Sequence, residues 1–144
     1  MRKLKLSVNP SLINKPWDLS RSNSGFSACE LTIEELAEVA KMGFCFSYQF
    51  VDGIRKAQNF IASDFIAIDI DDGWVIQDAL KNLTISSYCS LLYTTSSHTP
   101  DHPRFRLVFV LPRTITDANE IKAATRALAW SPPAPSAVTA TPPR

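Results

Sequence analysis

One apolar segment that ends in acidic residues constrains the fold and chemistry of this chain most strongly. Residues 65–73 read FIAIDIDDG, with no charge before Asp69. Side chains alternate across a β-strand, so Asp69 and Asp71 share one face, about 7 Å apart along the backbone at about 3.3 Å per residue. The apolar residues divide between the two faces, with Phe65 and Ala67 beside the acids and Ile66, Ile68 and Ile70 opposite. This pattern predicts a buried strand over residues 64–71.

The paired acids have two interpretations. Their oxygens can converge on one divalent cation, or on two held about 3.5–4 Å apart as in phosphoryl-transfer sites. Mg²⁺ or Mn²⁺ is then the expected ion, because hard cations prefer carboxylate oxygen. Asp and Gly also form ordinary turns, and Asp can cap a following helix. Asp69 and Asp71 are therefore candidate metal ligands, with a simple turn as the alternative.

A second group of candidate residues lies between the two following strands, where residues 93–106 read YTTSSHTPDHPRFR. Ser96 and His98 point the same way if the chain is still extended there. Arg104 and Arg106 share one face of the next strand. Arginine binds phosphate oxygens bidentately, and a hydroxyl or a neutral histidine can add hydrogen bonds. These four residues can therefore cradle a triphosphate, whose oxygens the metal ions would bridge.

Each of these residues also has an ordinary structural interpretation. Arg104 and Arg106 can form the exposed face of an edge strand, where charge discourages aggregation. His98 can be a solvated loop residue. A zinc site at Cys89, His98 and His102 would lack the second cysteine pair that is typical of such sites. The phosphate-binding interpretation therefore depends on whether these side chains meet the acidic strand in space.

Apolar alternation and capping signals divide the rest of the chain into helices and strands. Thr32 with Glu35, and Asp117 with Glu120, have the spacing of capping boxes. The expected elements are a helix from Thr32 to about Met42, a strand over 44–50, a connection over 55–60, the acidic strand, a short helix over 74–82, a strand over 87–95, a strand over 104–111 stopped by Pro112, and a helix ending near Trp130. This order predicts an α+β fold with a mostly antiparallel sheet and packed helices, close to a ferredoxin-like or RNA-recognition-motif-like layout.

Length and composition indicate one globular domain. The chain has 144 residues, of which 45% are hydrophobic and 20% charged, and a net charge of +1 that gives no general argument for nucleic acid. Residues 1–27 are basic and rich in turn formers, which predicts an irregular arm that either touches phosphate or is merely solvated. Residues 28–130 form the expected core, and the Pro-rich residues 131–144 an extended tail. Three scattered cysteines and the lack of a long apolar run predict a cytoplasmic protein with reduced thiols and no membrane partner.

Together, these motifs resemble those of the archaeo-eukaryotic primase superfamily, in particular the primase-polymerases of plasmids and phages. That family's first motif is an apolar strand running into DxD, which Phe65–Asp71 matches. Its second motif is SxH, which Ser96–His98 matches, followed here by the strand Arg104–Phe109. The resemblance extends from about Gly43 to Trp130.

The resemblance implies a palm-like catalytic core that joins nucleotides on a DNA template with Mg²⁺ or Mn²⁺. By this analogy Asp69 and Asp71 coordinate the metals. His98 contacts the phosphates of the incoming nucleotide with support from Ser96. Arg104 or Arg106 adds positive charge. The implied partners are nucleoside triphosphates, a single-stranded or primed DNA template, and a helicase domain or protein.

The chain departs from the family in one respect. The family's third motif, an apolar residue followed by Asp, lies on a strand after the last helix, where this chain has its Pro-rich segment. No Asp follows Asp117. We therefore expect an incomplete primase core, interrupted by a truncation or a frame shift, with a natural Pro-rich linker as the equal alternative. The competing function is an inactive remnant that binds nucleotide or single-stranded DNA. A glycosyltransferase DxD motif is a weaker third interpretation, because it gives Ser96 and His98 no role.

Overall fold

The computed structural model describes residues 1–13, 23–71 and 73–129 and has an α+β fold with antiparallel sheets and four α-helices. In chain order the elements are β1 (Leu4–Ile13), β2 (Ser27–Leu31), α1 (Ile33–Lys41), β3 (Phe44–Ser47), β4 (Gln49–Phe50), 3₁₀ turns at Val51–Gly53 and Ala57–Asn59, β5 (Phe60–Ile70), α2 (Ile76–Leu80), α3 (Leu83–Tyr88), β6 (Cys89–Thr94), β7 (Phe105–Ile115) and α4 (Ala118–Ala129). No helix in these ranges is long and apolar enough to span a membrane.

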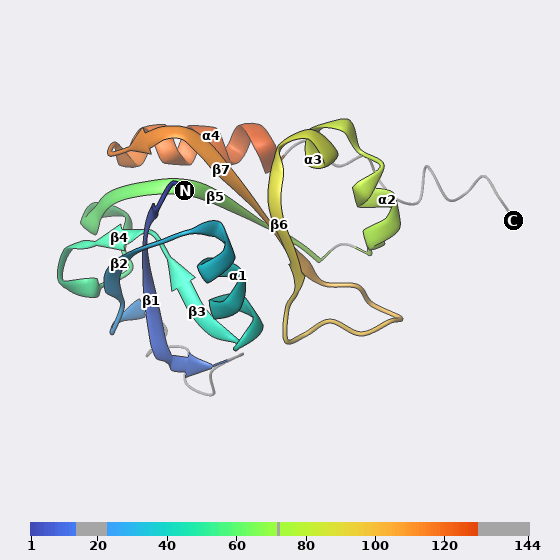
Figure 1. Ribbon diagram of the computed structural model, residues 1–144, viewed down its shortest axis with the longest axis horizontal. Helices are drawn as coiled ribbons and strands as arrows, with labels where there is room; N and C mark the ends of the chain where they lie inside the picture. The colour runs from blue at the N-terminus through green and yellow to red at the C-terminus, as the bar shows by residue number, and fades with distance from the viewer. Residues whose placement is uncertain (14–22, 72, 130–144) are drawn as a thin grey trace, which may run out of the picture.

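Two antiparallel sheets form the framework (Figure 1). The larger sheet has the strand order β4-β5-β7-β6, and the smaller has the order β2-β1-β3. The acidic strand β5 is therefore a central strand, paired with β7 from Ile66 opposite Phe109 to Ile70 opposite Phe105. This register sets Asp69 directly across from Arg106.

Both faces of β5 are buried for most of its length, as its sequence predicts. Ile66, Ile68 and Ile70 pack with residues from the helices α2, α3 and α4 on one face. Phe65, on the opposite face, packs with residues from β1, β3 and α1. Figure 1 shows the resulting layers, with α4 on one side of β5 and β7 and the smaller sheet with α1 on the other. The two acids share the face of the smaller sheet.

The N-terminal segment corrects the sequence prediction. Residues 1–27 were expected as an irregular arm, but β1 is the central strand of the smaller sheet, and β2 begins at Ser27. Leu4 and Leu6 are fully buried in the core. The alternation of leucine with polar residues in this segment is the pattern of a half-buried strand. The positive charges of the segment favour a solvated arm instead, and they conceal this pattern. Residues 14–22 lie outside the described part of the chain.

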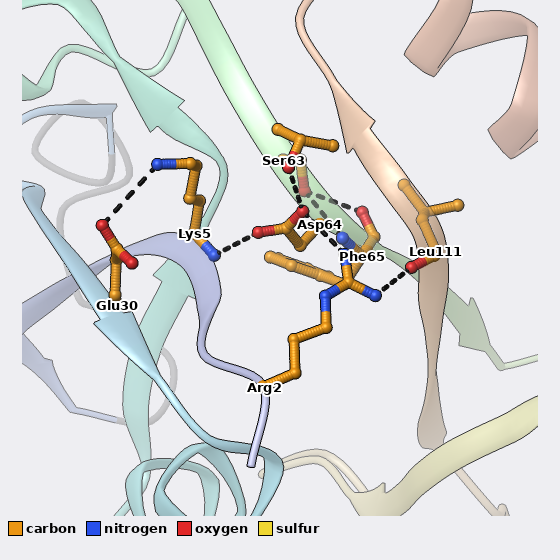
Figure 2. Close-up of polar contacts among 8 residues, drawn as sticks. Arg2, Lys5, Glu30, Ser63, Asp64, Phe65 and Leu111 are labelled. Atoms are coloured by element: carbon orange, nitrogen blue, oxygen red, sulfur yellow. Dashed lines mark hydrogen bonds and ion pairs between the residues drawn. The ribbon is translucent and has the colours of Figure 1, made fainter.

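A buried carboxylate joins this N-terminal strand to the main sheet (Figure 2). Asp64, on β5, is only 2% exposed. Its Oδ2 accepts a hydrogen bond from the backbone N–H of Lys5 at 2.7 Å, and its Oδ1 accepts from Nη2 of Arg2 at 2.9 Å and from the Thr114 hydroxyl at 2.5 Å. Arg2 also donates to the backbone carbonyl of Leu111. One side chain thus holds β1, β5 and β7 together.

The hydrogen bonds to Asp64 outweigh the cost of its burial. Burial alone raises the pKa of this carboxyl group, but the Thr114 hydroxyl, the Lys5 N–H and the charge of Arg2 together hold the pKa below its usual value. The carboxylate is therefore ionised and stabilising at neutral pH.

Strand β7 does not stop at Pro112, contrary to the sequence prediction, but continues to Ile115. Its register with β5 shifts between Ser63, which lies opposite Ile115, and Phe65, which lies opposite Val110. The extra residues of β7 form a bulge. Pro112 is tolerated because β6 pairs with β7 no further than Phe109, so Pro112 interrupts no ladder on that side.

Smaller differences concern the ends of elements. The expected strand over 44–50 is divided at Tyr48 into β3 and β4, which belong to different sheets. Helix α3 was not predicted and is capped by Asn82, which accepts from Thr84 and Ile85 N–H groups. The capping box at Thr32 is confirmed.

At α4, Asp117 accepts from the N–H of Asn119, whereas Glu120 pairs with Arg113 instead of completing a capping box. Trp130 and the Pro-rich segment 131–144 lie outside the described residues.

We predict that Asp64→Asn lowers the free energy of unfolding by about 3 kcal/mol at pH 7, because the change removes the charge that its buried donors face. The folded-state pKa is depressed, so the contribution is complete above the unfolded-state pKa of about 3.9 and is lost as pH falls through the folded-state value. Urea unfolding followed by circular dichroism between pH 2.5 and 7 measures both effects. Glu30→Gln, which removes the exposed partner of Lys5, is the control and should cost less than about 1 kcal/mol. Equal stability of parent and Asp64→Asn would contradict the role of Asp64.

We also predict that Gly53→Ala destabilises the fold far more than Gly73→Ala. Both glycines have a positive φ, of 65° and 91°. A Cβ at Gly53 would lie 2.1 Å from the backbone oxygen of Phe26, whereas a Cβ at Gly73 would meet nothing within 4 Å. We expect a loss of about 1 kcal/mol at Gly73 from backbone strain alone, and of about 3 kcal/mol or more at Gly53. Similar thermal midpoints for the two variants would show that the contact with Phe26 is easily relaxed.

Candidate functional site

Three side chains from neighbouring strands form a polar ladder at one end of the larger sheet. Asp69 on β5 lies opposite Arg106 on β7, which lies opposite Tyr93 on β6. Arg106 donates from Nε to Oδ1 of Asp69 at 2.5 Å and from Nη2 to Oδ2 at 3.3 Å, a bidentate pair. Its Nη1 donates to the Tyr93 hydroxyl at 3.1 Å, and its guanidinium carbon lies 5.9 Å from the centre of that ring.

The second acid has a looser arginine partner. Nη1 of Arg104 lies 3.7 Å from Oδ2 of Asp71, an ion pair without a short hydrogen bond. The side chains of Asp69 and Asp71 are 61% and 67% exposed, so both carboxylates are open to solvent and to ligands. The two acids and the two arginines expected from the sequence therefore meet at one place.

Burial and pairing act on Arg106 in opposite directions. Burial lowers the pKa of its guanidinium, but the hydrogen bond to Asp69 and the interactions with Tyr93 outweigh this and leave the pKa raised. Burial raises the pKa of the Tyr93 hydroxyl, against the effect of the nearby Arg106 charge. Arg106 is thus a fixed cation and Tyr93 a neutral hydrogen-bonding group.

The sequence prediction that Ser96 and His98 point the same way requires an extended chain at these residues. The chain forms a turn there instead. The N–H of His98 donates to the carbonyl of Thr95 at 3.0 Å, which closes a turn. Nδ1 of His98 accepts from the backbone N–H of Arg104 at 3.1 Å. His98 therefore fixes the loop that carries Arg104, and its Nδ1 is occupied by that bond.

Small cavities surround the ladder. One of about 150 Å³ is lined by both acids, both arginines and Ser97. Another of about 160 Å³ is lined by Ser96, Tyr93 and Arg106, and a third of about 210 Å³ by Asp69, Arg106 and Arg55. Ser97, rather than Ser96, thus borders the two acids.

Sequence reasoning missed three of these residues. The sequence places Tyr93 on a predicted strand, but it does not show that Tyr93 lies opposite Arg106. That pairing follows only from the register of β6 and β7. Ser97 and Arg55 carry no sequence signal, because a loop and a packing contact bring them to the site.

The described residues contain only part of a metal-binding set. No three side chains of His, Cys, Asp or Glu in these ranges lie close enough together to hold an ion, and this includes the zinc alternative at Cys89, His98 and His102. Asp69 and Asp71 supply the right oxygen donors for Mg²⁺ or Mn²⁺. Each would have to exchange its arginine for the ion.

Comparison with known protein families gives a match over most of the chain. The family model described as the VapE N-terminal domain matches residues 27–131, which include β5, β7 and α4. The search of curated proteins and the search of solved structures gave no match. The likeness to primase-polymerases therefore depends on the motifs alone. Because the match covers most of its length, the chain belongs to the VapE N-terminal domain family, which is linked to phage- and plasmid-replication-associated proteins.

Proposed function

We propose that this chain is a replication-associated module that binds a divalent-metal complex of a nucleoside triphosphate at the Asp69–Arg106 ladder. The observation that carries the proposal is the meeting of two exposed carboxylates with two arginines on one sheet face. A metal–triphosphate complex carries both charges, cationic at the metal and anionic at the phosphates. The site offers a partner for each.

Binding would proceed by exchange of ion pairs. Asp69 and Asp71 would hold the metal ion with their carboxylates, and Arg104 and Arg106, released from these acids, would bind the phosphate oxygens. Neither half is favourable alone, because a metal without phosphate would leave Arg106 beside a cation. Metal and nucleotide should therefore bind together far more tightly than either binds separately.

The order of elements supports a palm-like core of the primase-polymerase type. From β5 onward the chain runs through a helical pair, β6, β7 and α4, and the three strands lie in the order β5-β7-β6. This order is compatible with the first elements of a βαββαβ unit and so supports the RNA-recognition-motif-like layout expected from the sequence. In that layout the ladder lies at the ends of the two central strands.

The proposal also concerns whether the bound nucleotide is turned over. Template-directed joining of nucleotides needs enough carboxylates to fix two metal ions, and a misplacement of about 1 Å can cost about 100-fold in rate. Two acids are present at the ladder among the described residues. We therefore propose that residues 1–144 bind nucleotide, and single-stranded or primed DNA, without efficient synthesis. A helicase domain or protein is the expected partner for such a module.

The first test is the binding of a non-hydrolysable deoxynucleoside triphosphate with and without Mn²⁺, measured by calorimetry. We expect Mn²⁺ to strengthen binding at least about tenfold, and Asp69→Asn to abolish that gain because the amide is a poor ligand for a hard cation. Arg106→Lys should weaken binding because it loses the bidentate geometry. Asp52→Asn, which removes an exposed carboxylate elsewhere at a φ of 56° that Asn also adopts, should behave like the parent. An equal Mn²⁺ effect in Asp69→Asn would refute the site.

The second test is primer extension with Mn²⁺, a primed template and labelled nucleotides. We expect no extension by residues 1–144 under conditions in which calorimetry shows bound nucleotide. Robust extension that Asp69→Ala abolishes would show that the two acids suffice for catalysis. It would then assign the chain as a complete nucleotidyltransferase.

A further inference from the structure

A larger cavity, lined by none of the ladder residues, lies between α4 and the β4 edge of the larger sheet. Its volume is about 480 Å³, within the usual range of ligand pockets. One wall is a single face of α4, formed by residues at helical spacing: Ala118, Ile121, Lys122, Thr125 and Arg126. The opposite wall comes from β4, the 3₁₀ turn at Ala57–Asn59 and the start of β5.

Aromatic rings line this cavity. Tyr48 and Phe60 pack edge to face with ring centres 5.5 Å apart, and Phe50 lies 6.2 Å from Tyr48. Phe60 is half-buried, so part of its ring is open to the cavity. Tyr48 is held from the other side by its contact with Phe65. Fixed rings of this kind present faces on which a flat apolar group can stack at little entropic cost.

Four cations surround these rings, and the described residues that line the cavity include no carboxylate. They are Arg55, Lys56, Lys122 and Arg126, and none takes part in the ion pairs found among the described residues. Arg55 is held in place by its stacking 5.1 Å over the Phe26 ring and by a 3.3 Å hydrogen bond to Asn23. Lys122 and Arg126 lie one turn apart on α4, so their charges face the same space.

We infer that this α4–β4 cavity binds a nucleotide unit of single-stranded DNA. A base stacks on the aromatic wall, and its neighbouring phosphates lie against the four cations. The combination of aromatic faces with a cationic rim is the arrangement that single-stranded nucleic acid requires, since stacking accepts any base and the backbone needs positive charge. None of the four cations belongs to an ion pair found among the described residues, so their positive charge can complement that of the phosphates. The inference deepens the proposed function, on which it rests, by assigning the place where single-stranded DNA binds. It involves neither the acids of the ladder nor a metal ion.

The cavity also has a path toward the ladder. Ser47, Tyr48 and Arg55 line both this cavity and the smaller one that contains Asp69 and Arg106. Single-stranded DNA with a base stacked on Phe60 would therefore continue past Arg55 toward the ladder.

Fluorescence anisotropy of a labelled 12-nucleotide oligo-dT, in EDTA and without nucleoside triphosphate, tests the inference. We expect Lys122→Gln/Arg126→Gln to weaken binding about tenfold at 50 mM salt and to reduce the slope of log K against log salt by about 1.4, since each lost phosphate contact contributes about 0.7. Phe60→Leu, which keeps an apolar side chain but removes the ring, should weaken binding about fivefold or more without changing that slope. Circular dichroism confirms that each variant is folded.

The control variant is Lys41→Gln/Lys81→Gln, which removes two exposed helix-end charges that line none of these cavities. It should bind like the parent. A matching abasic oligomer should bind more weakly than oligo-dT and be insensitive to Phe60→Leu. Equal losses in the control and the α4 variant, or abasic binding as tight as oligo-dT binding, would overturn the inference. Because EDTA is present, a failure here leaves the metal–nucleotide proposal unaffected, and a failure of that proposal leaves this result unaffected.

Discussion

The buried carboxylate of Asp64 is the contact on which the layered arrangement depends. A single ionised group, 2% exposed, accepts hydrogen bonds from β1, from β7 and from the side chain of Arg2. Burial of a charge is costly unless every lone pair finds a donor, so the carboxylate specifies where the N-terminal strand must lie. The smaller sheet is then fixed against the face of β5 that carries Asp69. The geometry of the ladder thus depends on a residue five positions earlier on the same strand.

The ladder itself stores opposite charges in contact. Asp69 and Asp71 would repel each other if left alone, and Arg106 would be costly to bury without a partner. The pairing of these acids with the arginines stabilises this end of the sheet in the absence of a ligand, and it keeps both negative and positive groups there. The cavity under α4 has the contrasting arrangement, because none of its cations belongs to an ion pair found in the described part of the chain. These arrangements are the basis for proposing a ligand of mixed charge at the first site and a polyanion at the second.

Much of the main sheet could be predicted from sequence, because local patterns determine it. The alternation in β5, the capping box at Thr32 and the shared face of Arg104 and Arg106 each depend on neighbouring residues. The arginines meet the acids as expected, whereas His98 is not among the residues that line the cavity containing both acids. The N-terminal strand was missed because its charges outweighed its leucines in the sequence analysis, and their partner, Asp64, lies about sixty residues away. The turn at His98 and the cavity under α4 depend on tertiary contacts that no local pattern reveals.

The bulge in β7 has a consequence for which residue lies opposite Asp69. Ser63 lies opposite Ile115 and Phe65 opposite Val110, so the register changes by an odd number of residues between the two parts of the β5–β7 pairing. Had the first register continued, Asp69 would lie opposite Phe109 rather than Arg106, and the facing side of β7 would be apolar. The register shift at segment 111–114, at the far end of the sheet, is thus what sets Arg106 rather than Phe109 opposite Asp69.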